Sequence, residues 1–242
     1  MSDLKFARVF SMLFIVALLI TFIFFGALCS NQTMKIFFVG NTFKDMKEDI
    51  YNHQNKRVPE DSIVFLGDSI TEMYDLNRYY KGKIDNFVNR GISSETSTEV
   101  LERLETNVIS LAPKKVILLI GTNDLNKGAT PDEIVDNIRK IAMRIRSFNK
   151  KTEVYVESVL PVNNGAYLLS KSIVNKRLNS DIDRINEELR ANALLCGYTY
   201  IDTNTPLKDN NGMLNRDYSV DGLHISKAGY AVITDTIMSY IA

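Results

Sequence analysis

The chain is poor in residues that mark several protein classes. Its 242 residues include two cysteines, two histidines and no tryptophan. Cys29 lies in an apolar N-terminal run and Cys196 lies far from it, so the pair cannot staple a folded core and stability must come from ordinary burial. Basic and acidic residues balance at 29 each, with no dense Lys/Arg run. We therefore expect no nucleic-acid partner.

An uncharged, mostly apolar stretch runs from Val9 to Cys29. About 21 residues at 1.5 Å each give a helix of roughly 31 Å, which matches a bilayer core. The stretch exceeds the apolar region of a cleaved signal peptide, about 7–15 residues. We expect residues 9–29 to span a membrane. Two alternatives remain: cleavage after Cys29, with Ala27 three positions back, and a lipid anchor on Cys29, which Leu28 fits poorly.

The charges that flank this stretch are nearly balanced across it. Lys5 and Arg8 precede it and three lysines follow before residue 48, so the positive-inside count is close to neutral. A short flank before a large domain favours a single-pass cell-membrane protein with an extracytoplasmic domain, or a secreted domain if the segment is cleaved. The expected organisation is an anchor or signal segment (1–30), a connector with a helix (31–61) and a folded domain (62–242).

The folded domain shows an alternation of expected strands and helices. The strands are SIVFL (62–66), NFVNRG (86–91), KVILLIG (115–121), EVYVESVL (153–160) and YTYID (198–202). Helical spacing or start signals mark residues 96–111, 131–148, 176–195 and 226–241. This alternation predicts an α/β fold, a flavodoxin-like doubly wound sheet of about five parallel strands with helices on both faces. Ligands of such sheets sit beyond the carboxyl ends of the strands.

The first expected strand runs directly into GDSIT, residues 67–71. Ser69 would stand at the carboxyl edge of the sheet, where the first N–H groups of a helix have no intrahelical partner. A nucleophilic hydroxyl needs this place if the same N–H groups are to stabilise an oxyanion. The alternative is that Ser69 merely caps the helix. GDSIT is not the G-x-S-x-G elbow of the α/β-hydrolases, because no glycine follows two residues later.

A serine nucleophile needs a base, and the chain offers two histidines. His53 stands among Asn, Gln and Lys in the connector helix, where a solvated surface role is expected. His224 stands in DGLHIS (221–226), three residues after Asp221. In a loop, that spacing lets the carboxylate bind one imidazole nitrogen while the other faces the serine. The alternative is a plain Asp-Gly turn with a capping histidine.

Two more strand ends carry groups that can donate to an oxyanion. GTND (121–124) places the amide of Asn123 at the sheet edge, and NRGIS (89–93) would expose the backbone N–H of Gly91. Taken singly, each also looks like an ordinary turn. The conjunction is what indicates a site, because three strand ends and one C-terminal loop carry a nucleophile, two donors and an Asp–His pair in order.

This set of blocks closely resembles the SGNH (GDSL-type) hydrolase family, named for its Ser, Gly, Asn and His. The resemblance covers roughly three quarters of the chain. It implies Ser69 as nucleophile and first oxyanion N–H, with Gly91 and Asn123 as the other donors. It implies His224 as general base, oriented by Asp221. The stretch from NRGIS to GTND is similar to the branch of platelet-activating-factor acetylhydrolase catalytic subunits and bacterial carbohydrate esterases.

The resemblance implies a serine esterase that works through an acyl-enzyme. No cofactor is required, and no His/Cys/carboxylate cluster suggests a metal. Two rival classes remain. An O-acyltransferase would pass the acyl group to a sugar hydroxyl with the same residues, and a non-catalytic flavodoxin-like binding module would need none of them.

Composition of the expected rim loops bears on the substrate. VNNGAY (162–167) and residues 202–222 are rich in Asn, Asp, Thr and Gly and poor in large apolar residues. Such loops can bind sugar hydroxyls but offer few contacts to a fatty chain, which gains about 0.8 kcal/mol per buried methylene. We expect a short acyl group, chiefly acetyl, on a polar small-molecule or glycan alcohol. The alternative is a lysophospholipid, since an anchor would hold the enzyme at a lipid surface.

Overall fold

The computed structural model describes residues 42–241. The expected membrane segment, residues 9–29, lies outside the described residues, as does the start of the connector. The chain divides into two compact units after Lys47; of the first, residues 42–47 are described and are helical. No helix within residues 42–241 is both long and apolar enough to cross a bilayer.

Five parallel strands form one sheet in the order β2-β1-β3-β4-β5. They are β1 (Ile63–Gly67), β2 (Phe87–Gly91), β3 (Lys115–Leu119), β4 (Glu153–Glu157) and β5 (Thr199–Ile201). This is the flavodoxin-like doubly wound order, so the expected fold class of the domain is confirmed. Gly67 at the end of β1 pairs with Gly91 and with Leu119, so the carboxyl ends of three strands lie level at one edge.

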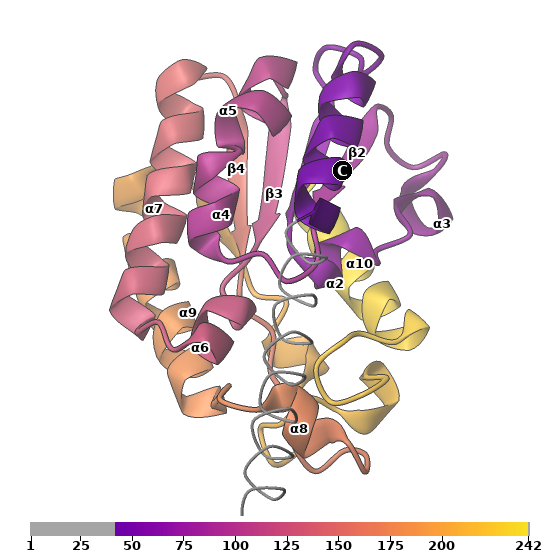
Figure 1. The fold of residues 1–242 in the computed structure, drawn as a ribbon, viewed down its shortest axis with the longest axis vertical. Helices are drawn as coiled ribbons and strands as arrows, with labels where there is room; N and C mark the ends of the chain where they lie inside the picture. The colour runs from indigo at the N-terminus through magenta and orange to yellow at the C-terminus, as the bar shows by residue number, and fades with distance from the viewer. Residues whose placement is uncertain (1–41, 242) are drawn as a thin grey trace, which may run out of the picture. The chain divides into compact units, whose positions relative to one another are not determined.

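Helices cover both faces of the sheet (Figure 1). One face packs against α4 (Ser97–Glu102), α7 (Pro131–Phe148) and α9 (Asn179–Cys196), and the other against α3 (Leu76–Tyr80) and α10 (Lys227–Ile241). Alternate strand side chains enter the two cores: Val64 and Val116 join the first, whereas Phe65 and Ile117 join the second. Because both faces of the sheet are covered, β1 and the part of β3 after Lys115 are apolar throughout.

The long helix α7 has the bounds that the sequence predicts. Thr130 and Glu133 form a reciprocal capping box, and Pro131 occupies the first turn, where its missing N–H costs nothing. The stripe that faces the core consists of Ile134, Val135, Ile138, Ile141, Ala142 and Ile145. Local capping signals and a strong apolar period therefore fix this element together.

The helix expected over residues 96–111 is broken into three pieces. They are α4, α5 (Leu104–Asn107) and the 3-10 helix η1 (Ile109–Leu111). The first break falls at Arg103, whose side chain turns into the interior to meet Glu95. The helix expected to open at Ser69 is present as α2 (Ser69–Glu72). Other short elements were not predicted: α6 (Thr122–Lys127), α8 (Ser170–Val174), η2 (Thr205–Leu207) and η3 (Arg216–Tyr218).

Candidate active site

Ser69 lies at the carboxyl edge of the sheet, as the first residue of α2. The residue that caps α2 is Asp68, whose side chain accepts a hydrogen bond from the Ile70 N–H at 3.0 Å. Ser69 is therefore not the cap, and its hydroxyl is free for another partner. Gly67 allows this close turn, because an added Cβ would clash with the Leu119 carbonyl and with Thr71 Oγ1.

His224 and Asp221 reach Ser69 from the loop before α10. His224 Nε2 lies 3.2 Å from Ser69 Oγ, and His224 Nδ1 lies 2.6 Å from Asp221 Oδ2. The other oxygen of Asp221 accepts the backbone N–H groups of Leu223 and His224, at 2.9 and 2.7 Å. The geometry is that of a nucleophile, a base and a group that orients the base.

The electrostatics of Asp221 suit that orienting role. Partial burial alone would raise its pKa, but the hydrogen bonds from the His224 side chain and from the two backbone N–H groups outweigh burial. The net effect lowers the pKa of Asp221 below 3.8. The carboxylate is therefore ionised at neutral pH and can hold the Nδ1–H of His224.

Asn123 follows β3 as the second residue of α6, and its amide is held from both sides. Its Nδ2 donates to the Glu95 carbonyl at 3.0 Å and makes a longer contact with Asp68 Oδ2 at 3.5 Å, and its Oδ1 accepts from Arg177 Nη2 at 2.8 Å. Asn123 lines the same cavity as Ser69 and His224, so the structure brings these three predicted residues together. The cavity measures about 330 Å³. The remaining lining residues are Met73, Ser93, Ser94, Asn126, Lys127, Ile173, Arg177 and Leu223.

The structure does not bring Gly91 to this cavity. Its N–H already donates to Asn89 Oδ1 at 2.8 Å, and it is not among the lining residues. A Cβ at Gly91 would clash with the Glu72 backbone nitrogen, so this glycine is needed for the packing of α2 on β2. This geometry does not favour the expected role of Gly91 as an oxyanion donor.

Ser94, which the sequence reading missed, does line the cavity. Its φ of 67° places it in the left-handed region, where a non-glycine residue is uncommon. Within residues 42–241, no hydrogen bond engages the Ser94 N–H. The only local sequence signal for Ser94 is that a short polar residue stands directly before an acidic residue and the N-cap of a helix.

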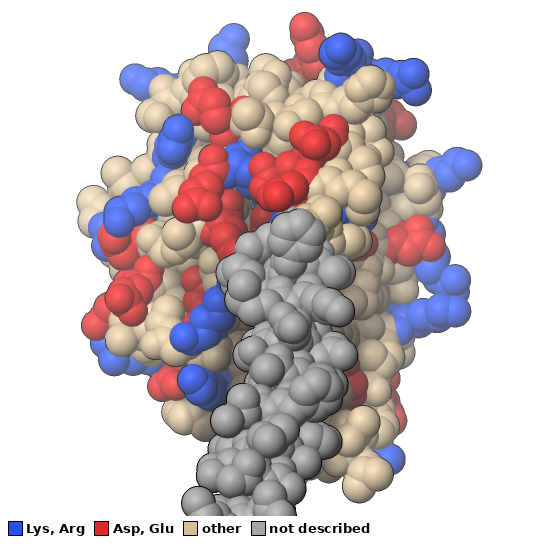
Figure 2. Space-filling view, viewed as in Figure 1, with Lys and Arg blue, Asp and Glu red and all other residues tan. Residues whose placement is uncertain are grey.

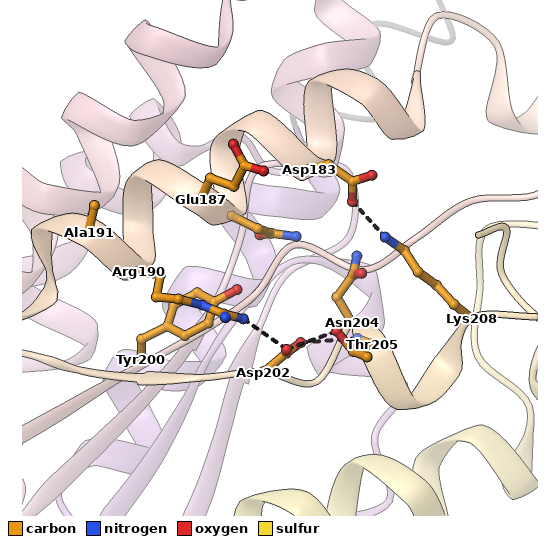
Figure 3. Close-up of a pocket in the computed structure, with 10 residues that line it drawn as sticks. Asp183, Glu187, Arg190, Ala191, Tyr200, Asp202, Asn204, Thr205 and Lys208 are labelled. Carbon is orange, nitrogen blue, oxygen red and sulfur yellow. Dashed lines mark hydrogen bonds and ion pairs between the residues drawn. The ribbon is translucent and has the colours of Figure 1, made fainter.

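Two larger cavities lie away from this chemistry. One of about 420 Å³ lies between α9, β5 and η2, where Arg190 pairs with Asp202 and Lys208 with Asp183 (Figure 3). Another of about 650 Å³ lies at the amino ends of the strands and includes Lys115. Neither is lined by a histidine, so neither holds a nucleophile–base pair of this kind.

The other histidine lies apart from this cavity. His53 is exposed on the helix over residues 42–55. No group of three or more His, Cys, Asp or Glu in the described part of the chain could hold a metal ion. Acidic and basic side chains are interspersed over the face seen in Figure 2, without an extended field of one sign.

Comparison with known proteins supplies an independent view of the same residues. The profile of the GDSL-like Lipase/Acylhydrolase family matches residues 65–232. A protein of solved structure from Streptococcus pneumoniae, provisionally described as a platelet activating factor, superposes with a TM-score of 0.79 at 30% identity. That match covers 87% of this chain and 99% of the other.

Curated relatives extend the comparison to other named enzymes. The platelet-activating factor acetylhydrolase IB subunit alpha1 of Pongo abelii is 25% identical over 188 residues, 75% of this chain and 76% of that protein. The N-acylneuraminate cytidylyltransferase of Escherichia coli O18:K1:H7 is 26% identical over 202 residues, 81% of this chain. The match spans 45% of the cytidylyltransferase, less than half its length.

Proposed function

The chain belongs to the GDSL-like lipase/acylhydrolase family of ester hydrolases, and on that premise we propose a serine esterase that removes short acyl groups, chiefly acetyl, from polar or carbohydrate alcohols. The observation that carries the proposal is the continuous set of contacts from Ser69 Oγ through His224 to Asp221, opening on one small cavity. Each step of acyl transfer can be assigned to one of these groups.

In the first half-reaction, Ser69 Oγ attacks the ester carbonyl while His224 Nε2 takes the hydroxyl proton. The tetrahedral oxyanion is stabilised by the Ser69 N–H and by the Nδ2 amide of Asn123. His224 then gives the proton to the leaving alcohol, which departs and leaves an acyl-Ser69 ester. Water repeats the sequence, with His224 again as base, and restores the free serine.

The second backbone donor in this proposal is Ser94 in place of Gly91. Ser94 lines the cavity in a left-handed conformation and its N–H has no hydrogen bond in the described part of the chain, whereas the Gly91 N–H is occupied by Asn89. A backbone N–H without a hydrogen-bond partner in the protein is able to donate to the negative charge that develops on the oxyanion. The loop that carries Ser94 is held by the buried side chain of Glu95.

The size and lining of the cavity support a short acyl group. Its volume of about 330 Å³ lies near the bottom of the range of small-molecule sites, roughly 300–1,000 Å³. Serine, asparagine and lysine side chains outnumber the apolar ones, which are Met73, Ile173 and Leu223. The acetylhydrolase and N-acylneuraminate names of two relatives point to acetyl and sugar chemistry, as analogy.

The proposal is tested by comparing kcat/KM for p-nitrophenyl acetate, octanoate and palmitate. We expect acetate to be the best of the three, because the cavity offers little room for methylenes beyond the carbonyl. A steady rise of kcat/KM with chain length would exclude the short-acyl assignment. A sugar acceptor added to the acetate reaction tests the transferase alternative, because a transferase would form the acetylated sugar.

A lipid ester is the second candidate, and one observation favours it. Leu168 and Leu169 stand 97% and 66% exposed on the loop before α8, the helix whose Ile173 lines the cavity. Exposed leucines beside a site can contact acyl chains or a lipid surface. The Escherichia coli K12 protein named thioesterase 1/protease 1/lysophospholipase L1 is 27% identical over 134 residues. Activity on lysophosphatidylcholine that exceeds activity on the acetate ester would favour this candidate.

We also propose that residues 9–29 anchor the enzyme in a membrane, with the catalytic domain on the extracytoplasmic side. The support is their length and lack of charge. Fractionation of cells that express the full chain, compared with a chain lacking residues 1–30, tests the anchor. Cleavage of the domain by external protease in intact spheroplasts tests its orientation.

A further inference from the structure

Arg177 is a buried cation at the candidate site, and it is not one of the site residues that the sequence predicts. It lies in the turn between α8 and α9 and is 5% exposed. Its Nε donates to the backbone oxygen and hydroxyl of Thr122, at 2.9 and 3.0 Å. Its Nη1 donates to the carbonyls of Ile173 and Val174, at 3.0 and 3.2 Å. The guanidinium is thus fixed at both ends before it meets Asn123.

The contact with Asn123 determines which way that amide faces. Arg177 has donors only, so the group opposite Nη2 must be the amide oxygen, and this oxygen lies at 2.8 Å. On the other side, the Glu95 carbonyl accepts from Nδ2 at 3.0 Å. A reversed amide would set donor against donor and oxygen against oxygen. Reversal would also turn a carbonyl dipole toward the place where the oxyanion forms.

We propose that Arg177 is a positioning residue, which holds the Asn123 amide so that the Nδ2 hydrogen not bound by Glu95, whose contact with Asp68 Oδ2 is long at 3.5 Å, is available to the developing oxyanion. The inference rests on the proposed function, because it assumes that Asn123 serves as an oxyanion donor. A charged donor on Oδ1 also polarises the amide and strengthens the hydrogen bond that its N–H donates to the oxyanion. Arg177 acts here through Asn123 and makes no contact with the reacting atoms.

A direct role for Arg177 is the competing explanation. Arg177 lines the cavity. One of its two Nη2 hydrogens bonds to Asn123, and within the described residues the other has no hydrogen-bond partner. If that hydrogen bound the substrate, loss of Arg177 would raise KM and would do so whether or not Asn123 is present. A positioning role predicts a lower kcat that depends on Asn123. The two roles therefore separate in a double-mutant cycle.

The experiment measures kcat and KM for p-nitrophenyl acetate in Arg177→Met, Asn123→Ala and the double variant. We expect Asn123→Ala to lower kcat by about 10²–10³ and Arg177→Met by about 10–100-fold, with KM within about twofold. In the Asn123→Ala background, Arg177→Met should cost less than about threefold. Arg177→Lys should recover part of the loss, since it restores a single donor to Oδ1.

Arg184→Met is the matched control, because Arg184 lies on α9 and is exposed and paired with Asp132 and Glu188. We expect it to leave kcat unchanged. Equal losses from Arg177→Met in both Asn123 backgrounds, or a rise in KM, would overturn the positioning role. An Asn123→Ala variant that keeps more than a tenth of the activity would instead overturn the proposed oxyanion donor. If Arg177→Met does not fold, as judged by circular dichroism, the same cycle is run with Arg177→Lys.

Discussion

Arg103 and Glu95 form an ion pair in the interior of the domain, with each side chain only 1% exposed. Arg103 Nε lies 2.9 Å from both carboxylate oxygens, and Nη2 lies 2.7 Å from Oε2. The same Nη2 donates to the Arg90 carbonyl near the end of β2 at 2.8 Å. One guanidinium therefore ties a strand end to the loop that carries Ser94, and the Glu95 carbonyl in turn holds Asn123.

We expect Arg103→Met to lower the free energy of unfolding by about 3–5 kcal/mol, because it leaves the Glu95 carboxylate buried without its cation. Urea unfolding followed by circular dichroism measures the loss. Arg144→Met is the control: Arg144 pairs with Glu105 on the surface, where both side chains are at least half exposed. Such a pair is worth less than about 1 kcal/mol. Equal losses in the two variants would show that the buried pair has no special role.

Ser69→Ala should abolish ester hydrolysis and leave the fold intact, since it removes one hydroxyl and leaves the Asp68 cap of α2 in place. The measurement is p-nitrophenyl acetate hydrolysis alongside the thermal unfolding midpoint. Ser93→Ala is the control, because Ser93 lines the same cavity but bonds Glu72 and has no histidine partner. If folded Ser69→Ala protein kept the wild-type rate, Ser69 would not be the nucleophile.

Asp221→Asn should lower kcat by about 10³–10⁴ with little change in stability. The amide can still accept the backbone N–H groups of Leu223 and His224, but it no longer stabilises the protonated imidazole or selects the Nδ1–H tautomer. Acyl-enzyme formation followed by stopped flow measures the effect on the chemical step. A loss smaller than tenfold would mean that His224 is oriented by other contacts.

Much of the fold could be read from the sequence, for identifiable reasons. The strands are β-branched runs bounded by turn residues, and α7 carries its own capping box and proline, so local signals and tertiary packing agree there. The helix over residues 96–111 was predicted as one piece because its apolar period continues through Arg103. The helix is interrupted because Arg103 forms an ion pair with Glu95, and the spacing of apolar residues gives no information about such a contact.

The site residues could be predicted from the sequence only where they stand in short motifs at a strand end or in the loop before the last helix. Ser69, Asn123 and His224 stand in short motifs, and the structure gathers them into one cavity. The role of Gly91 does not follow from the sequence alone, because a glycine after a strand can serve either a ligand or a helix packed above it. Arg177 reaches Asn123 across 54 positions of sequence, and a single arginine between two helices carries no motif.

Ser94→Ala and Ser94→Gly should both keep activity within about threefold of wild type, because the proposed donor is the backbone N–H. Ser94→Gly should in addition raise the free energy of unfolding by about 0.5–1 kcal/mol, since glycine adopts the φ of 67° without steric cost. Kinetics on the acetate ester and urea unfolding check the two parts. A tenfold loss in folded Ser94→Ala would show that the hydroxyl is the working group.

The last prediction concerns pH and Glu157, at the end of β4. Its side chain is 4% exposed, and Oε2 has no hydrogen-bond partner in the described part of the chain. Burial raises the pKa of Glu157 from 4.5 to about 8, against a smaller lowering by Thr203. Between pH 4.5 and about pH 8, the Glu157 carboxyl keeps its proton in the folded state, whereas in the unfolded state it has released it.

Stability from this group is therefore fully present below about pH 4.5 and is lost as the pH rises to about 8. The loss is on the order of a few kcal/mol. Asp68, whose burial raises its pKa to about 7, contributes with the same sign. Glu157→Gln removes the contribution of Glu157, so the variant should match wild type at pH 5 and exceed it at pH 9. Urea unfolding at both pH values measures the difference, with exposed Glu102→Gln as control. If Glu157→Gln shifted stability equally at pH 5 and pH 9, Glu157 would not be the titrating group.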